Sequence, residues 1–306
     1  LYLLRIGLLQ MIHFDRIPAF AAINTAVEIG KKKCGRQTAG FINAVLRKAA
    51  KEHAGVELPD QKEEPDQFIS VRYSLPLWLT RRWIKQYGFD RTTRLCNQIN
   101  TIPMMTLRVN RLKTETATLT DHLSREVGQI IPARFAENGL KFANPDTPVS
   151  ELKTFKKGWF QIQDEAAQIV TELLDPKPAE TILDACAGLG GKTGHIAQLM
   201  DNTGSLTAMD IESYKLDALQ VEMKRLGYTN VTTRSENLLK ITIKDFDTYF
   251  DRVLVDAPCT GLGVLQRNPD TRWKRSRHDI SRLAGQQKKI LNAAANLVKP
   301  GGILVY

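Results

Sequence analysis

The second half of the chain alternates short apolar runs with helical segments, and this alternation most constrains its fold. From residue 158 onward, each run has the length of a buried strand, and residues with helical periodicity follow it. The expected strands are 181–185, 205–210, 231–234, 252–256 and 302–306, and the expected helices are 166–174, 194–200, 214–226 and 282–297. This pattern predicts a doubly wound sheet that binds ligands at the carboxyl ends of its strands.

A glycine-rich loop follows the first expected strand and leads into a helix, with the sequence DACAGLGGKT over residues 184–193. Glycines let a ligand approach the backbone closely, and a helix N-terminus presents free N–H groups. A phosphate-binding Walker loop would need glycine at Cys186, and a dinucleotide fingerprint would need glycine at Thr193. S-adenosylmethionine needs a tight glycine turn and acids at the first two strands, where Asp184 and Asp210 stand. The sequence therefore favours this ligand over a purely structural turn.

A second chemical signal lies at the end of the fourth expected strand, where Asp256 and Cys259 stand in a loop rich in proline and glycine. In a doubly wound sheet this loop should lie beside the glycine loop. A thiol there can be a nucleophile if its pKa is lowered, although free cysteine is commonly a small buried hydrophobe. A thiolate that adds to carbon 6 of cytosine makes carbon 5 nucleophilic toward a sulfonium methyl group. An acid at N3 would stabilise that adduct, and Asp256 is the natural candidate.

The first half of the chain predicts two smaller parts joined by a polar segment. Residues 1–52 carry apolar residues at helical spacing and are rich in lysine and arginine, which a solvated helix face would also explain. The polar, acidic segment 55–67 contains two prolines and has the composition of a linker. Residues 68–157 predict a small α+β domain, with helices at 77–87 and 118–127 and a strand at 104–109. The expected domains are 1–55, 66–157 and 158–306.

The net charge of +10 and the isoelectric point near 9.4 favour a polyanionic partner, of which nucleic acid is the commonest. A basic cluster follows the second loop, with Trp273 among its members. Its cationic residues are Arg267, Arg272, Lys274, Arg275 and Arg277. Phosphate contacts and base stacking there would suit folded RNA with a splayed-out target base, and a plain solvated surface is the alternative.

Cysteine spacing and hydropathy argue against several other classes of protein. The four cysteines are Cys34, Cys96, Cys186 and Cys259; no pair has zinc-ligand spacing, and no metal is expected. So few cysteines in a chain of this length fit a reducing cytoplasm. No apolar run approaches the ~20 residues that a membrane helix needs, and no secretory leader is recognisable. We therefore expect a cytoplasmic protein, a monomer, without membrane contact.

Taken together, these motifs resemble the Sun-type RNA cytosine-5 methyltransferases, and most of all the bacterial 16S ribosomal RNA methyltransferase B branch. The likeness lies in the glycine loop, the Asp-Ala-Pro-Cys turn at 256–259, the Leu-Val-Lys-Pro-Gly-Gly run at 297–302, and the segments 158–166 and 267–273. The segment 41–47 resembles the NusB-like RNA-binding domain of that branch. The resemblance implies an α/β, Rossmann-like S-adenosylmethionine-dependent methyltransferase domain. An all-α NusB-like domain and a small α+β domain would precede it, and ribosomal RNA would be the partner.

The resemblance also assigns roles to individual residues. The cofactor-lining residues would be Cys186, Ala187, Gly188, Leu189, Gly190, Gly191 and Lys192. Asp210 would bind the ribose, and Asp256 would lie beside both cofactor and base. Asn237 stands where the family usually has an acid near the adenine, and the neighbouring Glu236 is a possible substitute. The chain departs from the family at Leu189, where proline is usual, so its turn is expected to be less rigid.

The attacking thiol of this family is a second cysteine, in a Thr-Cys pair just after the strand that here begins at Gly302. The chain stops at Tyr306, and both of its ends fall within apolar patterns, so we expect it to be cut at both ends. Cys259 would then be an assisting thiol that helps to release the product. On this interpretation the chain binds the cofactor and turns over poorly or not at all.

Two other functions stay open at this point. A catalytically inactive RNA-binding or assembly protein could use a methyltransferase fold, although a retired site need not keep its glycine loop and its Asp-Ala-Pro-Cys turn. A nicotinamide oxidoreductase would need glycine at Thr193 and would leave the second loop unexplained. Titration with each cofactor would separate these hypotheses.

Overall fold

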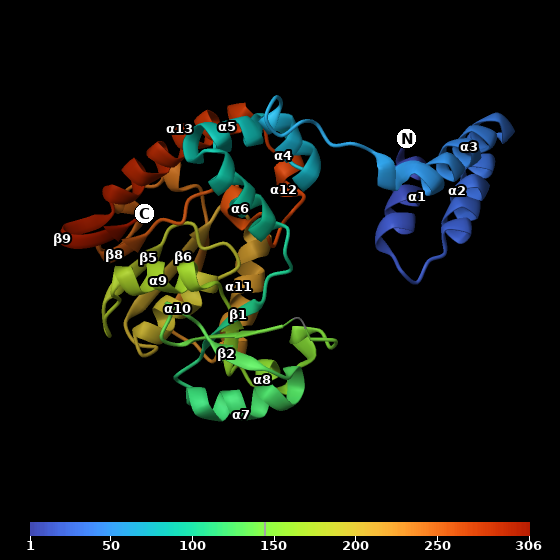
Figure 1. Cartoon of the computed structure of the whole chain (residues 1–306). Coiled ribbons are helices and arrows are strands. Elements are labelled where there is room, and N and C mark those ends of the chain that lie inside the picture. The colour runs from blue at the N-terminus through green and yellow to red at the C-terminus, as the bar shows by residue number, and fades with distance from the viewer. Residues whose placement is uncertain (144) are drawn as a thin grey trace. The chain divides into compact units, whose positions relative to one another are not determined.

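The computed structural model describes residues 1–143 and 145–306, which divide into two units, Leu1–Ser74 and Leu75–Tyr306 (Figure 1). The first unit is helical. Its helices are α1 (Tyr2–His13), α2 (Ala19–Cys34), α3 (Arg36–Glu52), the short 3-10 helix η1 (His53–Gly55) and α4 (Pro65–Tyr73). Within the described residues, no helix combines the length and apolar character needed to cross a membrane.

Helices α1 to α3 pack around a small apolar core, as their periodicity predicts. Ile23 and Ala26 of α2 meet Ile42 and Leu46 of α3 in this core. Gly30 allows α2 and α3 to approach closely, because a Cβ there would lie 2.6 Å from Ile42 Cδ1. The expected linker is partly confirmed: residues 56–64 carry no helix or strand, and α4 begins at Pro65, which favours the first turn of a helix.

The second unit begins with two helices and a four-stranded antiparallel sheet. The elements in chain order are α5 (Leu77–Tyr87), α6 (Phe89–Ile99), β1 (Met105–Val109), α7 (Thr116–Val127), β2 (Ile130–Pro132), β3 (Gly139–Phe142), η2 (Val149–Glu151), α8 (Lys153–Lys156) and β4 (Phe160–Ile162). The strand order β2-β3-β1-β4 and the βαββαβ succession give the ferredoxin-like arrangement. Leu119 and Leu123 of α7 pack against Leu107, Phe142 and Phe160 of the sheet, on the side where Figure 1 shows α7 and α8.

A five-stranded parallel sheet follows, with the order β7-β6-β5-β8-β9. The elements are α9 (Glu165–Leu174), β5 (Thr181–Asp184), α10 (Gly191–Leu199), β6 (Ser205–Asp210), α11 (Ser213–Leu226), β7 (Val231–Ser235), η3 (Leu238–Lys240), η4 (Ile243–Asp245), β8 (Phe250–Leu254), η5 (Leu262–Val264), α12 (Thr271–Lys274), α13 (Arg277–Ala295) and β9 (Val298–Val305). The order reverses direction between β5 and β8, so the carboxyl ends of these two strands flank the switch point where Rossmann-like sheets bind ligands. The predicted Rossmann-like class is confirmed.

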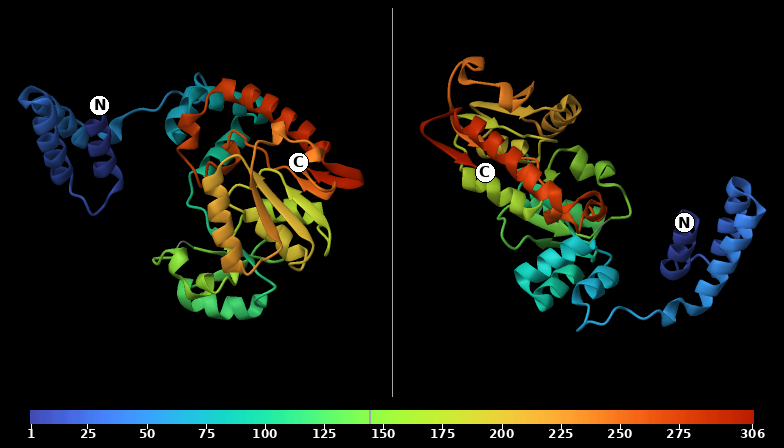
Figure 2. Two further views of the ribbon diagram at one scale, coloured as in Figure 1. Left: turned by 180° about the vertical axis from the view of Figure 1, so that it is seen from behind. Right: turned by 90° about the horizontal axis from the view of Figure 1, so that it is seen from above.

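Both faces of this sheet are buried, which explains why its strands are apolar without alternation. Ile182 faces the cluster formed by α9, α10 and α11, and Leu183 faces the opposite cluster, which includes Ile290 and Ala294 of α13. Figure 2 shows from two further directions that α13 runs across the sheet. Helices on both faces leave the carboxyl edge of the sheet as the place where its loops can meet a ligand.

A buried arginine joins the two sheets of the second unit. Arg108 of β1 is fully buried and donates to Gln161 at 2.8 Å, to Gln163, and to the carbonyl of Gly191 at 3.3 Å. No carboxylate contacts its guanidinium in the part of the chain that the structure describes, and burial lowers its pKa to about 10. With Gln198 Oε1, which accepts from Arg108 Nε at 3.3 Å, four carbonyl oxygens carry the hydrogen bonding of this charge, and that of Gly191 belongs to the first residue of α10.

Candidate active site

The glycine loop between β5 and α10 is held by backbone hydrogen bonds to its neighbours. Ala185 N donates to Leu254 O of β8 at 2.9 Å, and Ala187 N donates to Met209 O of β6 at 2.8 Å. The loop thus extends the sheet on both sides before it turns into α10. Its place at the switch point confirms that the first expected strand leads into the turn.

Glycine is required at Gly190 by both conformation and space. Its φ is +86°, and a Cβ there would lie 2.6 Å from Leu219 Cγ of α11. Gly188 and Gly191 differ, because a Cβ at either position would meet nothing within 4 Å. These two glycines therefore leave the backbone accessible from one side, as close approach of a ligand requires.

The carboxylate of Asp210, at the end of β6, caps the loop. It accepts from Gly188 N at 3.0 Å through one oxygen and from Glu212 N at 3.0 Å through the other. A carboxylate has about four acceptor positions, so lone pairs remain for hydroxyl donors. The acid predicted on the second strand thus lies against the glycine loop.

Asp184 is the most deeply buried acid of the site. Its Oδ2 accepts from the Thr193 hydroxyl at 2.7 Å, and its Oδ1 is buried with no hydrogen-bond partner among the residues that the structure describes. Burial raises the pKa of this carboxyl to about 6, against the lowering effect of Thr193 and Lys192. A buried oxygen without a donor is unfavourable by roughly 1–3 kcal/mol, so a ligand donor at this position would stabilise the site.

A cavity of about 260 Å³ lies against the loop. Six of its lining residues belong to the glycine loop and the start of α10: Cys186, Ala187, Gly188, Leu189, Gly191 and Lys192. The other four are Asp184, Asp256, Gln163 and Ala167. The sequence predicted most of this set, and the structure adds Gln163 and Ala167. Gln163 belongs to the segment after β4 and accepts from Arg108. In the sequence, Gln163 begins the Gln-Asp-Glu-Ala segment that resembles the family, but the resemblance assigns no role to this residue.

The loop after β8 carries the second group of candidate residues and brings Asp256 to the same cavity. Lys192 Nζ donates to Asp256 Oδ2 at 2.5 Å, and the Asp256 side chain is 58% exposed. Two side chains from later in the chain hold this loop: Arg275 Nε donates to Thr260 O at 2.9 Å, and Gln287 Nε2 donates to Pro258 O at 2.9 Å. Cys259 lies between these two anchored carbonyls and is exposed.

The two thiols near the cavity differ in their surroundings. Burial, helped by Asp184, Asp210 and Asp256, raises the pKa of Cys186 to about 12, so this thiol stays protonated. Cys259 is exposed and free to meet a substrate. Across residues 1–143 and 145–306, no three His, Cys, Asp or Glu side chains gather closely enough to hold a metal ion.

Asn237 follows β7 and caps η3, since its Oδ1 accepts from Leu239 N at 3.0 Å. Glu236 is exposed and pairs with Arg234 at 2.8 Å. The Arg234 guanidinium also lies 4.5 Å from the centre of the Phe246 ring. Glu236 is thus paired with Arg234, and Asn237 keeps its Nδ2 donors for a ligand.

The basic cluster after the second loop does not form one surface. Arg272 is buried and donates to Asn100 at 2.9 Å, and Arg275 is used on Thr260. Arg267 pairs with Asp164 and donates to Met104 O at 3.2 Å. Only Lys274 and Arg277 of the five are exposed without such a partner among the described residues, and Trp273 beside them is 60% exposed.

Three family models match successive parts of the chain. Residues 171–306 match the 16S rRNA methyltransferase RsmB/F model, residues 75–150 match the ferredoxin-like domain of the RsmF/B-like methyltransferases, and residues 1–51 match the NusB family. The matched segments follow the three architectures described above.

Full-length similarity agrees with these matches. The chain is 39% identical over 304 residues to the "Probable ribosomal RNA small subunit methyltransferase B" of Bacillus subtilis, covering 99% of this chain and 67% of that protein. The crystal structure of PH0851 superposes with a TM-score of 0.84 at 28% identity, covering 99% of this chain and 67% of that one. A methyltransferase homolog from Pyrococcus horikoshii gives 0.67 at 30% identity, covering 78% and 74%. The chain belongs to the 16S rRNA methyltransferase RsmB/F family.

Proposed function

We propose that the chain is part of an enzyme that methylates carbon 5 of a cytosine in small-subunit ribosomal RNA, with S-adenosylmethionine as the methyl donor. The observation that carries this proposal is the shared cavity: Asp256, three residues before Cys259, lines the same space as the glycine loop. A cofactor in the loop and a base at the exposed Asp-Ala-Pro-Cys turn would therefore meet. The resemblance of the motifs and the family membership support rRNA as the substrate.

The residues present fit S-adenosylmethionine. The unpartnered Oδ1 of Asp184 suits an ammonium donor, and the open sides of Gly188 and Gly191 suit close approach of the ligand. Asp210, at the end of β6, has lone pairs left for two ribose hydroxyls, and Asn237, after β7, would meet the adenine. When bound, the cofactor supplies an electrophilic methyl group on a positively charged sulfur. The loop's other predicted residues, Cys186 to Lys192, would surround it.

The chain's own residues would act on the cytosine. A thiolate adds to carbon 6, which forms a C–S bond and moves the electron pair of the 5,6 double bond toward carbon 5 and N3. Asp256 in its protonated form would donate its proton to N3, where negative charge collects, and Lys192 would hold the carboxyl group in place. After methylation, a base takes the carbon 5 proton, the electron pair of that C–H bond re-forms the 5,6 double bond, and the thiolate leaves carbon 6. Asp256 is thus the residue we assign to stabilise the adduct.

Two cysteines of the chain could be considered for the attack. The raised pKa of Cys186 argues against it, because only a thiolate is nucleophilic. We propose that Cys259 is an assisting thiol in product release. The attacking cysteine would belong to a Thr-Cys pair C-terminal to Tyr306. We also propose that the chain has three domains, at residues 1–55, 66–157 and 158–306. Its proposed location is the cytoplasm.

The direct test is methyl transfer to small-subunit ribosomal RNA from a labelled methyl donor, followed by digestion of the RNA to nucleosides and mass spectrometry. A chain extended past Tyr306 should produce 5-methylcytidine, and the chain ending at Tyr306 should bind the cofactor and transfer little. Label on another base or on another atom of cytosine would contradict the proposal. Cofactor binding without transfer by either chain would favour the RNA-binding or assembly function instead.

A further inference from the structure

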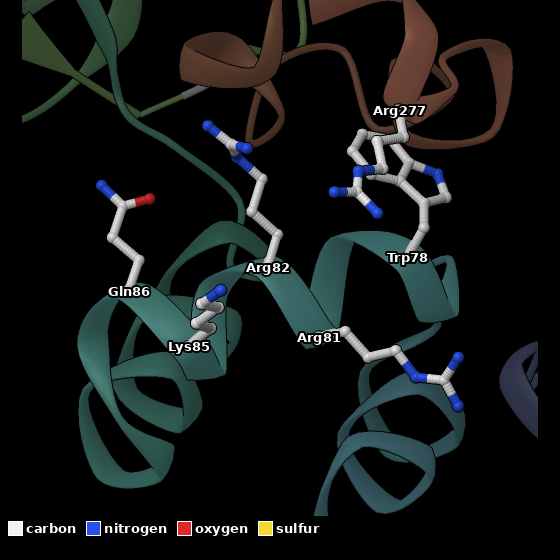
Figure 3. A pocket seen from close by; sticks show the side chains of 6 residues that line it. All are labelled: Trp78, Arg81, Arg82, Lys85, Gln86 and Arg277. Carbon is white, nitrogen blue, oxygen red and sulfur yellow. The ribbon is translucent and has the colours of Figure 1, made fainter.

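A basic cavity of about 630 Å³ lies between α5 and the start of α13, apart from the glycine loop. Its lining consists of Trp78, Arg81, Arg82, Lys85, Gln86 and Arg277, and Figure 3 shows these side chains. None of them lines the cavity beside the glycine loop. Four of the six are cationic and none is acidic, so the cavity suits an anionic ligand.

The sequence of α5 explains why the charges gather there. Leu79 and Trp83 face inward and are buried, so the residues at helical spacing on the other side face solvent. Arg82 follows the half-buried Trp78 by four residues, and Lys85 follows Arg82 by three, which sets them along one helix face. Arg277 meets this face from α13.

Most of these charges have no counter-ion. Arg82, Lys85 and Arg277 form no ion pair among the described residues, and Arg81 points away from them in Figure 3. Elsewhere in the same unit the arginines pair readily, as Arg252 does with Glu180 at 2.6 Å. Like charges that line one cavity repel each other, so an external polyanion would relieve the repulsion.

A second cavity extends from the first along the start of α13. A neighbouring cavity of about 570 Å³ shares Arg82 and Arg277 and adds the first turns of α13 from His278 to Ala284. Further along the same helix, Gln287 donates to Pro258 O in the loop that carries Cys259. Gln287 follows Arg277 by ten residues, which is roughly 15 Å along the helix axis. One helix thus links the basic cavity to the candidate active site.

We propose that this groove, lined by Trp78, Arg82, Lys85 and Arg277, binds a single-stranded stretch of RNA that flanks the target cytosine. Phosphates would contact the three cations, and a base would stack on the exposed part of Trp78, as in other single-strand sites. The aromatic ring beside the charges favours RNA over an acidic peptide. The inference rests on the proposed methylation of RNA and adds a place where the strand is held.

The test measures RNA affinity without methyl transfer. Fluorescence anisotropy would follow a labelled single-stranded fragment of 16S rRNA at several salt concentrations. The variant Arg82→Ala, Lys85→Ala, Arg277→Ala should lower the salt slope by about 2, because each single-strand phosphate contact contributes about 0.7. Trp78→Leu should weaken binding roughly fivefold or more without changing the slope.

A matched variant controls for net charge: Lys224→Ala, Lys240→Ala, Lys244→Ala removes three exposed cations outside both cavities. It should keep nearly the full slope. An equal loss in both triple variants, or displacement of RNA by polyglutamate as readily as by polyuridylate, would overturn the groove. Titration with S-adenosylmethionine is the separate check: unchanged cofactor binding in the groove variant shows that it is folded. If RNA binding then proves independent of the groove, the proposed methylation of RNA is not contradicted.

Discussion

The two loops at the switch point of the parallel sheet are built in different ways. The glycine loop after β5 is tied to β8 and β6 by its own backbone, through Ala185 N and Ala187 N, and to Asp210 through Gly188 N. The loop after β8 is exposed at Asp256 and Cys259, and long side chains from elsewhere hold it. The first loop is therefore fixed mainly by the backbone of the neighbouring strands, and the second is held by side chains that follow it in the sequence.

Because of this difference, we expect the first loop to serve cofactor binding and the second to serve methyl transfer. A loop whose shape is set by strand hydrogen bonds can present a formed cofactor site before any RNA arrives, which limits the ordering cost of binding. An exposed loop held at Thr260 and Pro258 leaves Asp256 and Cys259 open to a large substrate. We therefore expect changes in the first loop to affect cofactor binding and changes in the second to affect methyl transfer.

The largest expected effect is on chemistry at the second loop. Asp256→Asn keeps the shape of the side chain and removes its charge, so cofactor affinity should change little. Methyl transfer by a chain extended past Tyr306 should fall about 10²–10⁴-fold, the usual worth of an acid or base in proton transfer. Single-turnover transfer to 16S rRNA measures this, and a rate within a few-fold of the unmodified protein would remove Asp256 from the chemistry.

The next largest effect is on cofactor binding and compares Gly191 in the first loop with Gly263 in the second, since both have open space around them. Gly191→Asp adds a side chain where a Cβ meets nothing, so the fold should persist while the ligand's approach is blocked. Overpacking of this kind should weaken cofactor binding roughly tenfold to a hundredfold. Gly263→Asp is the matched control, because Gly263 in the second loop also has open space. Calorimetry should find normal cofactor binding in that control; equal losses would mean that the loops are not independent.

If the cofactor binds as proposed, we expect Asp184 to make its binding depend on pH. Its folded pKa of about 6 lies above the ordinary value, so the carboxylate is charged above pH 6 and increasingly protonated below it. An ammonium ligand pairs with the charged form, so the Kd should rise by up to about tenfold per pH unit as pH falls below 6. Asp184→Asn should bind more weakly at pH 7 and show a nearly flat profile between pH 5 and pH 7. A profile as steep as in the unmodified protein would assign the dependence to another group.

The smallest effect concerns the anchors of the second loop. Gln287→Leu removes the donor to Pro258 O, a neutral hydrogen bond worth about 0.5–1.5 kcal/mol, so methyl transfer should drop about twofold to tenfold. Cofactor affinity should stay unchanged, since the glycine loop has its own supports. Parallel measurement of transfer rate and of Kd checks this; a shift in Kd alone would contradict the division between the loops.

Sequence patterns could predict the parallel sheet and the glycine loop because their signals, the alternating apolar runs and the clustered glycines, lie in consecutive residues. The helix expected at 77–87 has those bounds, and the strand expected at 205–210 is β6. The long helix expected at 282–297 begins earlier, at Arg277, because Ser276 and Asp279 form a capping box. The short β2, β3 and β4, of three or four residues each, carry too little periodicity to be distinguished before the fold brings them together.

The roles of the arginines could not be predicted from the sequence. Arg272, Arg275 and Arg277 stand within six residues, yet one is buried, one holds Thr260, and one lines the groove. Their partners lie on α5, in the segment after α6, and in the second loop, so only the folded chain separates them. The sequence gives no sign of the role of Arg108 for the same reason: its acceptors are spread over the segment around β4 and over α10.

The central claim is that the glycine loop holds S-adenosylmethionine in a site that is complete without RNA. Calorimetric titration of the 306-residue chain with S-adenosylmethionine alone tests it most directly. We predict one site per chain, with a Kd on the order of micromolar, as is common for enzyme ligands, and no change in that Kd when rRNA is added. Binding that is absent without RNA and present with it, in a folded sample, would contradict the claim.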